Sequence, residues 1–84
     1  MIQVIVVDDH DLVRMGLVRL LGDADGIEVI KEGASGEDAI RLAKEHEPDV
    51  IMMDVRMPGI GGIEATRKIH RQFPDIRIIA VTAC

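Results

Sequence analysis

Apolar residues follow two patterns that alternate along the chain. In the first, they form short and nearly unbroken runs rich in Ile and Val, at residues 2–7, 27–31, 50–53 and 76–81. Such runs are typical of strands covered on both faces of a parallel sheet. In the second, apolar residues return every three or four positions, which predicts helices over residues 11–21, 35–45 and 63–73. This alternation predicts right-handed crossovers and an α/β fold, with helices on both faces of a parallel sheet.

Local signals predict where the second helix begins and ends. Ser35, followed three residues later by Asp38, resembles a capping box in which Asp replaces the preferred Glu. Pro48 prevents this helix from continuing. Side chains at helical spacing should face the sheet. They are Val13, Leu17, Leu20 and Leu21 in the first helix, Ile40 and Ala43 in the second, and Ile63, Thr66, Ile69 and Phe73 in the third.

The composition indicates one small globular domain. The 84 residues are 48% hydrophobic and 30% charged, without the bias of disordered chains. The net charge of -5 and the lack of a basic stripe argue against direct nucleic-acid binding by this segment. Because no apolar run reaches membrane-spanning length and no secretory signal opens the chain, we expect a cytoplasmic protein that does not contact membranes. Cys84 is the only cysteine, so no internal disulfide is expected.

Three carboxylates come directly after apolar runs. Asp8 and Asp9 follow the first run, and Asp54 follows the third. In the flavodoxin-like strand order these two strands are neighbours, and their carboxyl ends border the ligand crevice. Two carboxylates about 5 Å apart repel by roughly 3 kcal/mol at an effective dielectric near 20, so three together either hold a proton or bind a cation. A site whose ligands are all oxygen atoms favours Mg²⁺. Any one of these aspartates, taken singly, is more often a helix cap or a loop residue.

The other polar candidates carry weaker signals. Thr82 follows the fourth apolar run, and its hydroxyl could donate to a bound phosphate oxygen. The glycine-rich loop of residues 55–62 allows the backbone to come close to a ligand. His10, His46 and His70 lie on separate elements without ligand spacing, so we do not expect them to bind metal. The glycines follow no nucleotide-binding motif.

Taken together, the segments VIVVDDHDLVR, IMMDVRMPGIGGIEATRKI and IIAVTAC resemble the receiver domain of two-component response regulators. The branch that the chain resembles is the NarL/LuxR-type, and the likeness is greatest to the GacA-type global activator regulators. It extends over residues 1–84, with the motifs in order at the expected strand ends. The resemblance implies a flavodoxin-like (CheY-like) fold, here with four strands in the order 2-1-3-4.

The resemblance also implies a role for each site residue. Asp54 matches the aspartate that accepts a phosphoryl group from a sensor histidine kinase or a phosphotransfer protein. The metal shell implied for Mg²⁺ consists of Asp8, Asp9, Asp54 and the backbone carbonyl of Arg56. Two further positions are implied at the phosphoryl group, namely the switch hydroxyl of Thr82 and the backbone amide of Ala83. The implied output is control of transcription, with no enzymatic turnover.

The chain departs from the family pattern at its C-terminal end. Receivers of this type continue through a fourth helix, a fifth strand that ends in a phosphoryl-pairing lysine, and a fifth helix, and a DNA-binding output domain follows. We therefore expect residues 1–84 to be the N-terminal part of a receiver, truncated after the fourth strand, with impaired phosphate affinity and switching. The fourth strand should then present a free edge and join copies of the chain into a homo-oligomer through residues 76–81.

Two alternative functions remain from the sequence. In one, the chain acts only in association and is not phosphorylated, because the lysine is missing. In the other, it is a Mg²⁺-dependent aspartyl phosphohydrolase of the haloacid-dehalogenase type. That class has an Asp-x-Asp motif after its first strand, whereas Asp8 and Asp9 are adjacent here.

Overall fold

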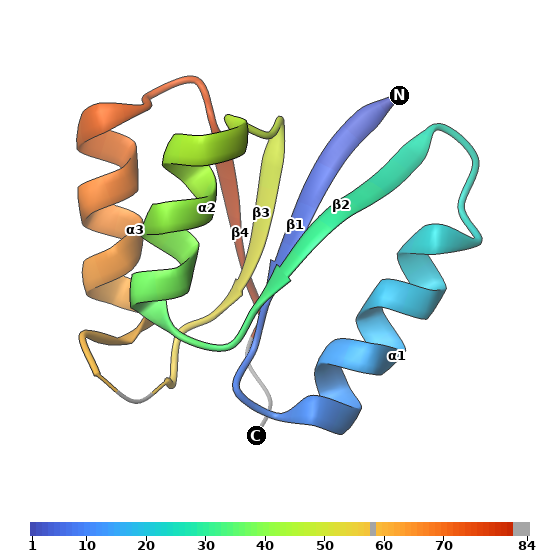
Figure 1. Cartoon of the computed structure of the whole chain (residues 1–84), viewed down its shortest axis with the longest axis horizontal. Coiled ribbons are helices and arrows are strands. Elements are labelled where there is room, and N and C mark those ends of the chain that lie inside the picture. The colour runs from blue at the N-terminus through green and yellow to red at the C-terminus, as the bar shows by residue number, and fades with distance from the viewer. Residues whose placement is uncertain (58, 82–84) are drawn as a thin grey trace.

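The computed structural model describes residues 1–57 and 59–81, in which strands and helices alternate (Figure 1). The elements are β1 (Ile2–Val7), α1 (Asp11–Gly22), β2 (Ile27–Gly33), α2 (Gly36–His46), β3 (Val50–Asp54), α3 (Gly61–Gln72) and β4 (Arg77–Val81). The strands form one parallel sheet in the order β2-β1-β3-β4. The predicted α/β fold and strand order are therefore confirmed. No helix in the described ranges is both long and apolar enough to cross a membrane.

The register of the central strands brings their carboxyl ends level with each other. β1 lies between β2 and β3, and its residues from Val4 onward are buried. Val7 of β1 pairs with Met53 of β3. The next residue on each strand is an aspartate, Asp8 or Asp54, so both carboxylates stand at the same edge of the sheet. This pairing, more than any other feature of the fold, positions the candidate site.

Helices cover the two faces of the sheet unequally. In Figure 1, α2 and α3 lie together on one face and α1 lies alone on the other. The buried hydrophobic cluster lies between the sheet and the α2–α3 pair. Its members are Ile5, Val7, Ala39, Leu42, Ala43, Ile51, Met53, Met57, Ala65, Ile69 and Ile76. The principal core is therefore one-sided and aliphatic.

Two of the expected inward-facing side chains point to solvent instead. Leu20 of α1 is 72% exposed and Ile63 of α3 is 66% exposed. The buried positions of α3 are Gly62, Ala65 and Ile69, so its inner face is rotated from the one that Ile63 predicted. The small residues Gly62 and Ala65 let the helix backbone come close to its neighbours, and a bulky Ile would prevent this approach.

The predicted cap of α2 is present, with one change of partner. The Ser35 hydroxyl accepts a hydrogen bond from the Asp38 backbone N–H (3.0 Å). In a capping box the Asp38 carboxylate would accept a hydrogen bond from the backbone N–H of Ser35. Here it accepts one from the backbone N–H of Ala34 (3.0 Å). The helix ends at His46, and the C-cap residue Glu47 has a left-handed backbone (φ 41°) directly before the buried Pro48.

Candidate functional site

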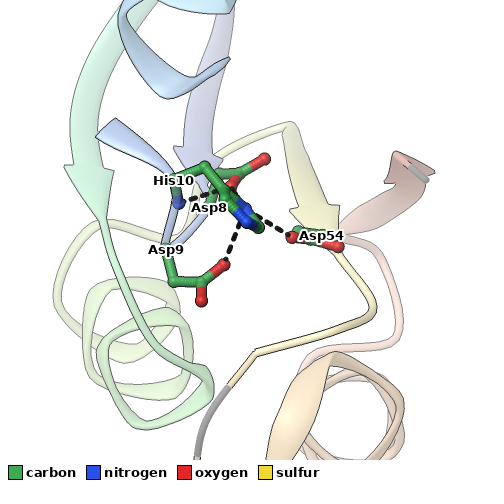
Figure 2. Close-up of side chains that lie close together, drawn as sticks. All are labelled: Asp8, Asp9, His10 and Asp54. Atoms are coloured by element: carbon green, nitrogen blue, oxygen red, sulfur yellow. Dashed lines mark hydrogen bonds and ion pairs between the residues drawn. The ribbon is translucent and has the colours of Figure 1, made fainter. Parts of the chain in front are cut away.

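Two aspartates are buried where the central strands end. Asp8 is 1% exposed and Asp54 is 3% exposed, which is unusual for charged side chains. Asp9, the next residue along the chain, is partly exposed. The structure thus brings together the three carboxylates that the sequence predicted to share a site, as Figure 2 shows.

The imidazole of His10 lies among these carboxylates. Its Nδ1 atom is 3.2 Å from Asp8 Oδ1, 3.1 Å from Asp9 Oδ1 and 3.7 Å from Asp54 Oδ2 (Figure 2). One ligand atom from each of the four residues lies within 4.8 Å of the others. The sequence predicted a solvated or capping histidine, and His10 is 60% exposed at the N-cap position of α1, but its contact with the acids was not predicted. Its position directly after the Asp-Asp pair was the signal that could have found it.

Backbone groups fix the orientation of both buried carboxylates. Asp8 Oδ1 accepts a hydrogen bond from the backbone N–H of His10 (2.8 Å). Asp54 Oδ1 accepts one from the backbone N–H of Arg56 (2.9 Å). The strand ends and the turns after them therefore hold the two side chains in place. The contact of Arg56 is made by its amide, and metal ligation by its carbonyl stays a prediction.

The donor set fits a hard divalent cation. Among the described residues, Asp8 Oδ2 is a buried oxygen with no hydrogen-bond partner, and buried Asp9 Oδ1 has only the ion pair with His10. A buried carboxylate oxygen without a partner costs free energy, and a cation between the acids would remove that cost and their mutual repulsion. Mg²⁺ binds through one or two carboxylates and retains water. Asp8, Asp9 and Asp54 together offer this kind of ligand set.

The carboxylates also change the titration of His10. Its pKa is raised above the ordinary value of 6.5, first by the hydrogen bond with Asp8 and then by the negative charge of Asp9. Protonated His10 therefore offsets part of the negative charge of the cluster.

Comparison with known proteins identifies the family. A family model described as response regulator receiver domain matches residues 4–84. The chain belongs to the response regulator receiver family. The response regulator GacA of Pseudomonas viridiflava is 58% identical over 84 residues, which are 100% of this chain and 39% of GacA. UvrY of Escherichia coli (strain K12) is 52% identical over 82 residues, which are 98% of this chain and 38% of UvrY.

A solved relative has the same fold. It is a two-component response regulator of the LuxR family from Aurantimonas sp. SI85-9A1, with a TM-score of 0.90 and 42% identity. The alignment covers 95% of this chain and 57% of that one. The present receiver chain spans 39% of the length of GacA and 38% of that of UvrY. The acidic cluster of Asp8, Asp9 and Asp54 is typical of the Mg²⁺ site of receivers.

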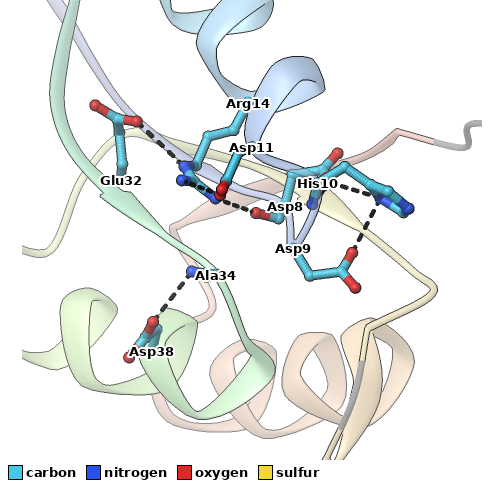
Figure 3. A network of polar contacts seen from close by, with 8 residues as sticks. All are labelled: Asp8, Asp9, His10, Asp11, Arg14, Glu32, Ala34 and Asp38. Atoms are coloured by element: carbon cyan, nitrogen blue, oxygen red, sulfur yellow. Dashed lines mark hydrogen bonds and ion pairs between the residues drawn. The ribbon is translucent and has the colours of Figure 1, made fainter.

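Arg14 is a residue of this receiver chain that the sequence analysis missed. Its guanidinium donates to the backbone carbonyl of Asp8 (2.8 Å) and to the carboxylate of Asp11 (2.7 Å). It also reaches Glu32 of β2 at 3.3 Å (Figure 3). Arg14 thereby ties the turn that carries the acidic pair to α1 and to the neighbouring strand. Arginine on an amphipathic helix gives no sequence signal for such a contact.

The glycine-rich loop has a packing role in this receiver chain. A Cβ on Gly62 would lie 2.2 Å from the backbone oxygen of Asp54 and 2.6 Å from Cα of Val55. Gly59 and Gly61 have positive φ angles of 77° and 76°. The sequence predicted that this backbone could come close to a ligand. That approach stays a prediction. Gly62 itself lies against the backbone of β3, which sets how α3 begins beside Asp54.

Some predicted positions lie outside the described residues. Thr82 and Ala83 are among them, and their roles at the phosphoryl group stay predictions. Cys84 and Pro58 are also outside. Of the other two histidines, His46 has its Nε2 atom 3.9 Å from Oε2 of Glu45, and His70 is exposed in the last turn of α3.

Proposed function

We propose that this chain is a phosphoacceptor receiver in which Asp54 takes a phosphoryl group from a sensor histidine kinase or a phosphotransfer protein. The supporting observation is the convergence of Asp8, Asp9 and Asp54 at one edge of the sheet, with ligand atoms within 4.8 Å. Family membership implies a sensor kinase as partner, and receivers in general are signalling modules and not enzymes. We further propose that the 84 residues are the N-terminal part of a receiver and act in the cytoplasm.

The reaction is a transfer between two residues. A carboxylate oxygen of Asp54 attacks phosphorus in line with the departing histidine nitrogen of the donor. An O–P bond forms and the N–P bond breaks, and its electron pair stays on the nitrogen, which then takes up a proton. Asp54 Oδ1 is held by the Arg56 amide, which leaves Oδ2 on the side of His10 and the acidic pair. The carboxylate is therefore already oriented before the donor arrives.

The acidic pair prepares the site for the incoming charge. Asp8, Asp9 and Asp54 would hold Mg²⁺, with the Arg56 carbonyl as a further proposed ligand. When bound, the cation offsets the charge on the transferred oxygens. The product carries added negative charge at the sheet edge, which can bias a two-state element. We propose Thr82, with the amide of Ala83, as that element, and control of transcription as the output of the whole protein.

The test uses Mg²⁺ with acetyl phosphate or beryllofluoride. With acetyl phosphate we expect one phosphoryl group per chain by mass spectrometry, and with either reagent we expect shifts of the amide resonances of Asp54 and Arg56. Asp54→Asn should abolish both responses. Asp25→Asn, at an exposed aspartate in a turn, is the matched control and should respond like the wild type. A folded wild-type chain that responds to neither reagent would contradict the proposal and support a role in association alone.

We also propose that this chain self-associates through β4. Among the described strands β4 lies at one edge of the sheet, and Ile79 is 50% exposed there. A second copy fits because identical edge strands can pair their free backbone N–H and C=O groups about a two-fold axis. Sedimentation should show a dimer at high micromolar concentration. Ile79→Lys should shift it toward monomer, and Ile63→Lys on exposed α3 should not. A compact wild-type monomer would refute this interface.

A further inference from the structure

Arg14 contacts the turn that carries the acidic pair, but it does not pair with the acids that would bind metal. One nitrogen of its guanidinium donates to the backbone carbonyl of Asp8 (2.8 Å). Within residues 1–57 and 59–81, its ion pairs are formed with Asp11 and Glu32 (Figure 3). The Arg14 side chain is only 18% exposed, although arginine is mostly exposed in proteins. Any influence of Arg14 on the site is therefore exerted through the backbone of Asp8.

The contacts of Asp8 leave one carboxylate oxygen for a cation. Its backbone N–H donates to the carbonyl of Gly33 (3.0 Å), and its backbone carbonyl accepts from Arg14. Its Oδ1 atom accepts from the backbone N–H of His10 (2.8 Å). Among the described residues, its Oδ2 atom has no hydrogen-bond partner, although Asp8 is only 1% exposed. Three of the four polar atoms of Asp8 are thus held in place, and the fourth is available to a metal ion.

The hydrogen bond from Arg14 also affects Asp9. The carbonyl of Asp8 and the N–H of Asp9 belong to one planar peptide group, so fixing that plane fixes the direction in which the chain enters Asp9. Arg14 is bound to the same turn a second time, because its own backbone N–H donates to the carbonyl of His10 (2.9 Å). We propose that Arg14 is a positioning residue, which holds the Asp8–Asp9 peptide in the orientation that binds Mg²⁺.

The two carboxylates around Arg14 offset the disadvantage of a positive charge near a metal site. An unpaired guanidinium would repel Mg²⁺ and weaken its binding. Asp11 and Glu32 accept hydrogen bonds from the other two guanidinium nitrogens, at 2.7 and 3.3 Å. They balance its charge and fix the direction of its planar fork. Lysine carries all its donors on one nitrogen, so it could not serve the carbonyl and both carboxylates in the same way.

A positioning role and a charge effect predict opposite signs for Mg²⁺ binding. If Arg14 acted through its charge alone, its removal would strengthen Mg²⁺ binding. If it holds the Asp8–Asp9 peptide, its removal weakens Mg²⁺ binding. The inference deepens the proposed function and rests on it, because it names a residue that prepares the metal site for phosphoryl transfer to Asp54.

The test compares the Mg²⁺ affinity of variants of the 84-residue chain by calorimetric titration. Arg14→Met keeps an unbranched apolar stem and removes the donors and the charge. It should weaken Mg²⁺ binding by about 10-fold, the lower end of the range for loss of a group that orients a metal ligand. Arg14→Lys keeps the charge and should have an affinity between those of Arg14→Met and the wild type.

Two controls separate positioning from charge and from stability. Arg19→Met removes a positive charge from an exposed position of the same helix and should bind Mg²⁺ normally. Ile69→Ala truncates a buried side chain on the α2–α3 face, and its folded chains should also bind Mg²⁺ with wild-type affinity. Urea denaturation establishes that each variant is folded under the conditions of the titration.

Each outcome decides the proposal. Weaker Mg²⁺ binding in Arg14→Met, with normal binding in both controls, supports it. Equal or tighter binding in Arg14→Met overturns it, and so does an equal loss in either control. If Arg14→Met does not fold, Arg14→Lys decides, and wild-type affinity in that variant overturns the proposal. Acetyl phosphate with Mg²⁺ is added to the wild type in parallel. A phosphoryl group on Asp54 there keeps the proposed function even if Arg14 proves dispensable.

Discussion

The two faces of the sheet show how differently the same sequence pattern can be used. On the α2–α3 face, Ile5, Ile51 and Ile69 are at most 1% exposed. On the other face, none of the 12 residues of α1 is buried, and Leu12 and Leu20 are 83% and 72% exposed. Both faces meet helices with apolar periodicity. The periodicity therefore predicts a helix, but it does not predict how deeply that helix is buried.

The width of the sheet explains why part of the face that carries α1 stays uncovered. Strands lie about 4.8 Å apart and a helix is about 10 Å wide, so one helix covers about two strands. Two helices, α2 and α3, suffice for one face of this sheet. α1 contacts β1 and β2, and side chains on the same face farther along the sheet, such as Ile79 of β4, stay half exposed.

The largest expected effect is a core truncation on the α2–α3 face. Ile69→Ala removes a side chain that is 1% exposed and should lower the free energy of unfolding by about 2–5 kcal/mol, because it leaves a cavity. Leu20→Ala on α1 should change it by less than about 0.5 kcal/mol. Urea denaturation measures both. Similar losses in the two variants would show that the faces contribute equally.

Glycine substitutions extend the comparison to the helix backbones. Gly62→Ala should destabilise the chain by about 1–3 kcal/mol, because its Cβ would meet the backbone of Asp54 at 2.2 Å. Gly16→Ala in α1 meets no atom within 4 Å and should stabilise by about 0.5–1 kcal/mol through helix propensity. Thermal and urea unfolding measure the sign of the change in stability for each variant. A neutral Gly62→Ala would contradict the close packing of α3 on β3.

The cap of α2 should have a smaller effect. Ser35→Ala removes the hydroxyl that accepts from the Asp38 N–H and should cost about 1 kcal/mol. Ser35→Thr keeps an acceptor and should retain most of the stability. α1 has no side-chain cap at His10, so no comparable contribution exists there. Equal stability of the wild type and Ser35→Ala in urea would refute the contribution of the cap.

The smallest expected effect is a change in acid sensitivity. The pKa of Asp38 is lowered from its ordinary value of 3.8, first by the Ala34 N–H and then by Arg41. The ionised form is thus favoured by folding, so its stabilisation is present above pH 3.8 and is lost as the pH falls through the lowered pKa. Asp38→Asn should flatten stability against pH below about pH 4. Identical slopes for the two chains in acid denaturation would contradict this role.

The sequence predicted the strands and the acid trio because both depend on short-range patterns. Unbroken apolar runs followed by aspartate place Asp8 and Asp54 at strand ends, and the parallel topology then makes those ends meet. Ile63 was misplaced because helical spacing alone does not say which of two overlapping faces is inside. The contacts of His10 and Arg14 with the acidic turn were not predicted, because they depend on the backbone angles of that turn, which no periodicity encodes.

The sequence alone thus determined the order of elements, the α/β class and the carboxylates that share one edge of the sheet, since hydrophobic period and strand ends are local properties. Only the tertiary structure decided how deep each helix is buried, that α3 approaches β3 through Gly62, and that the His10 ring lies against three acids. Those features depend on distances between segments far apart along the chain, which form only when the sheet and its helices pack together.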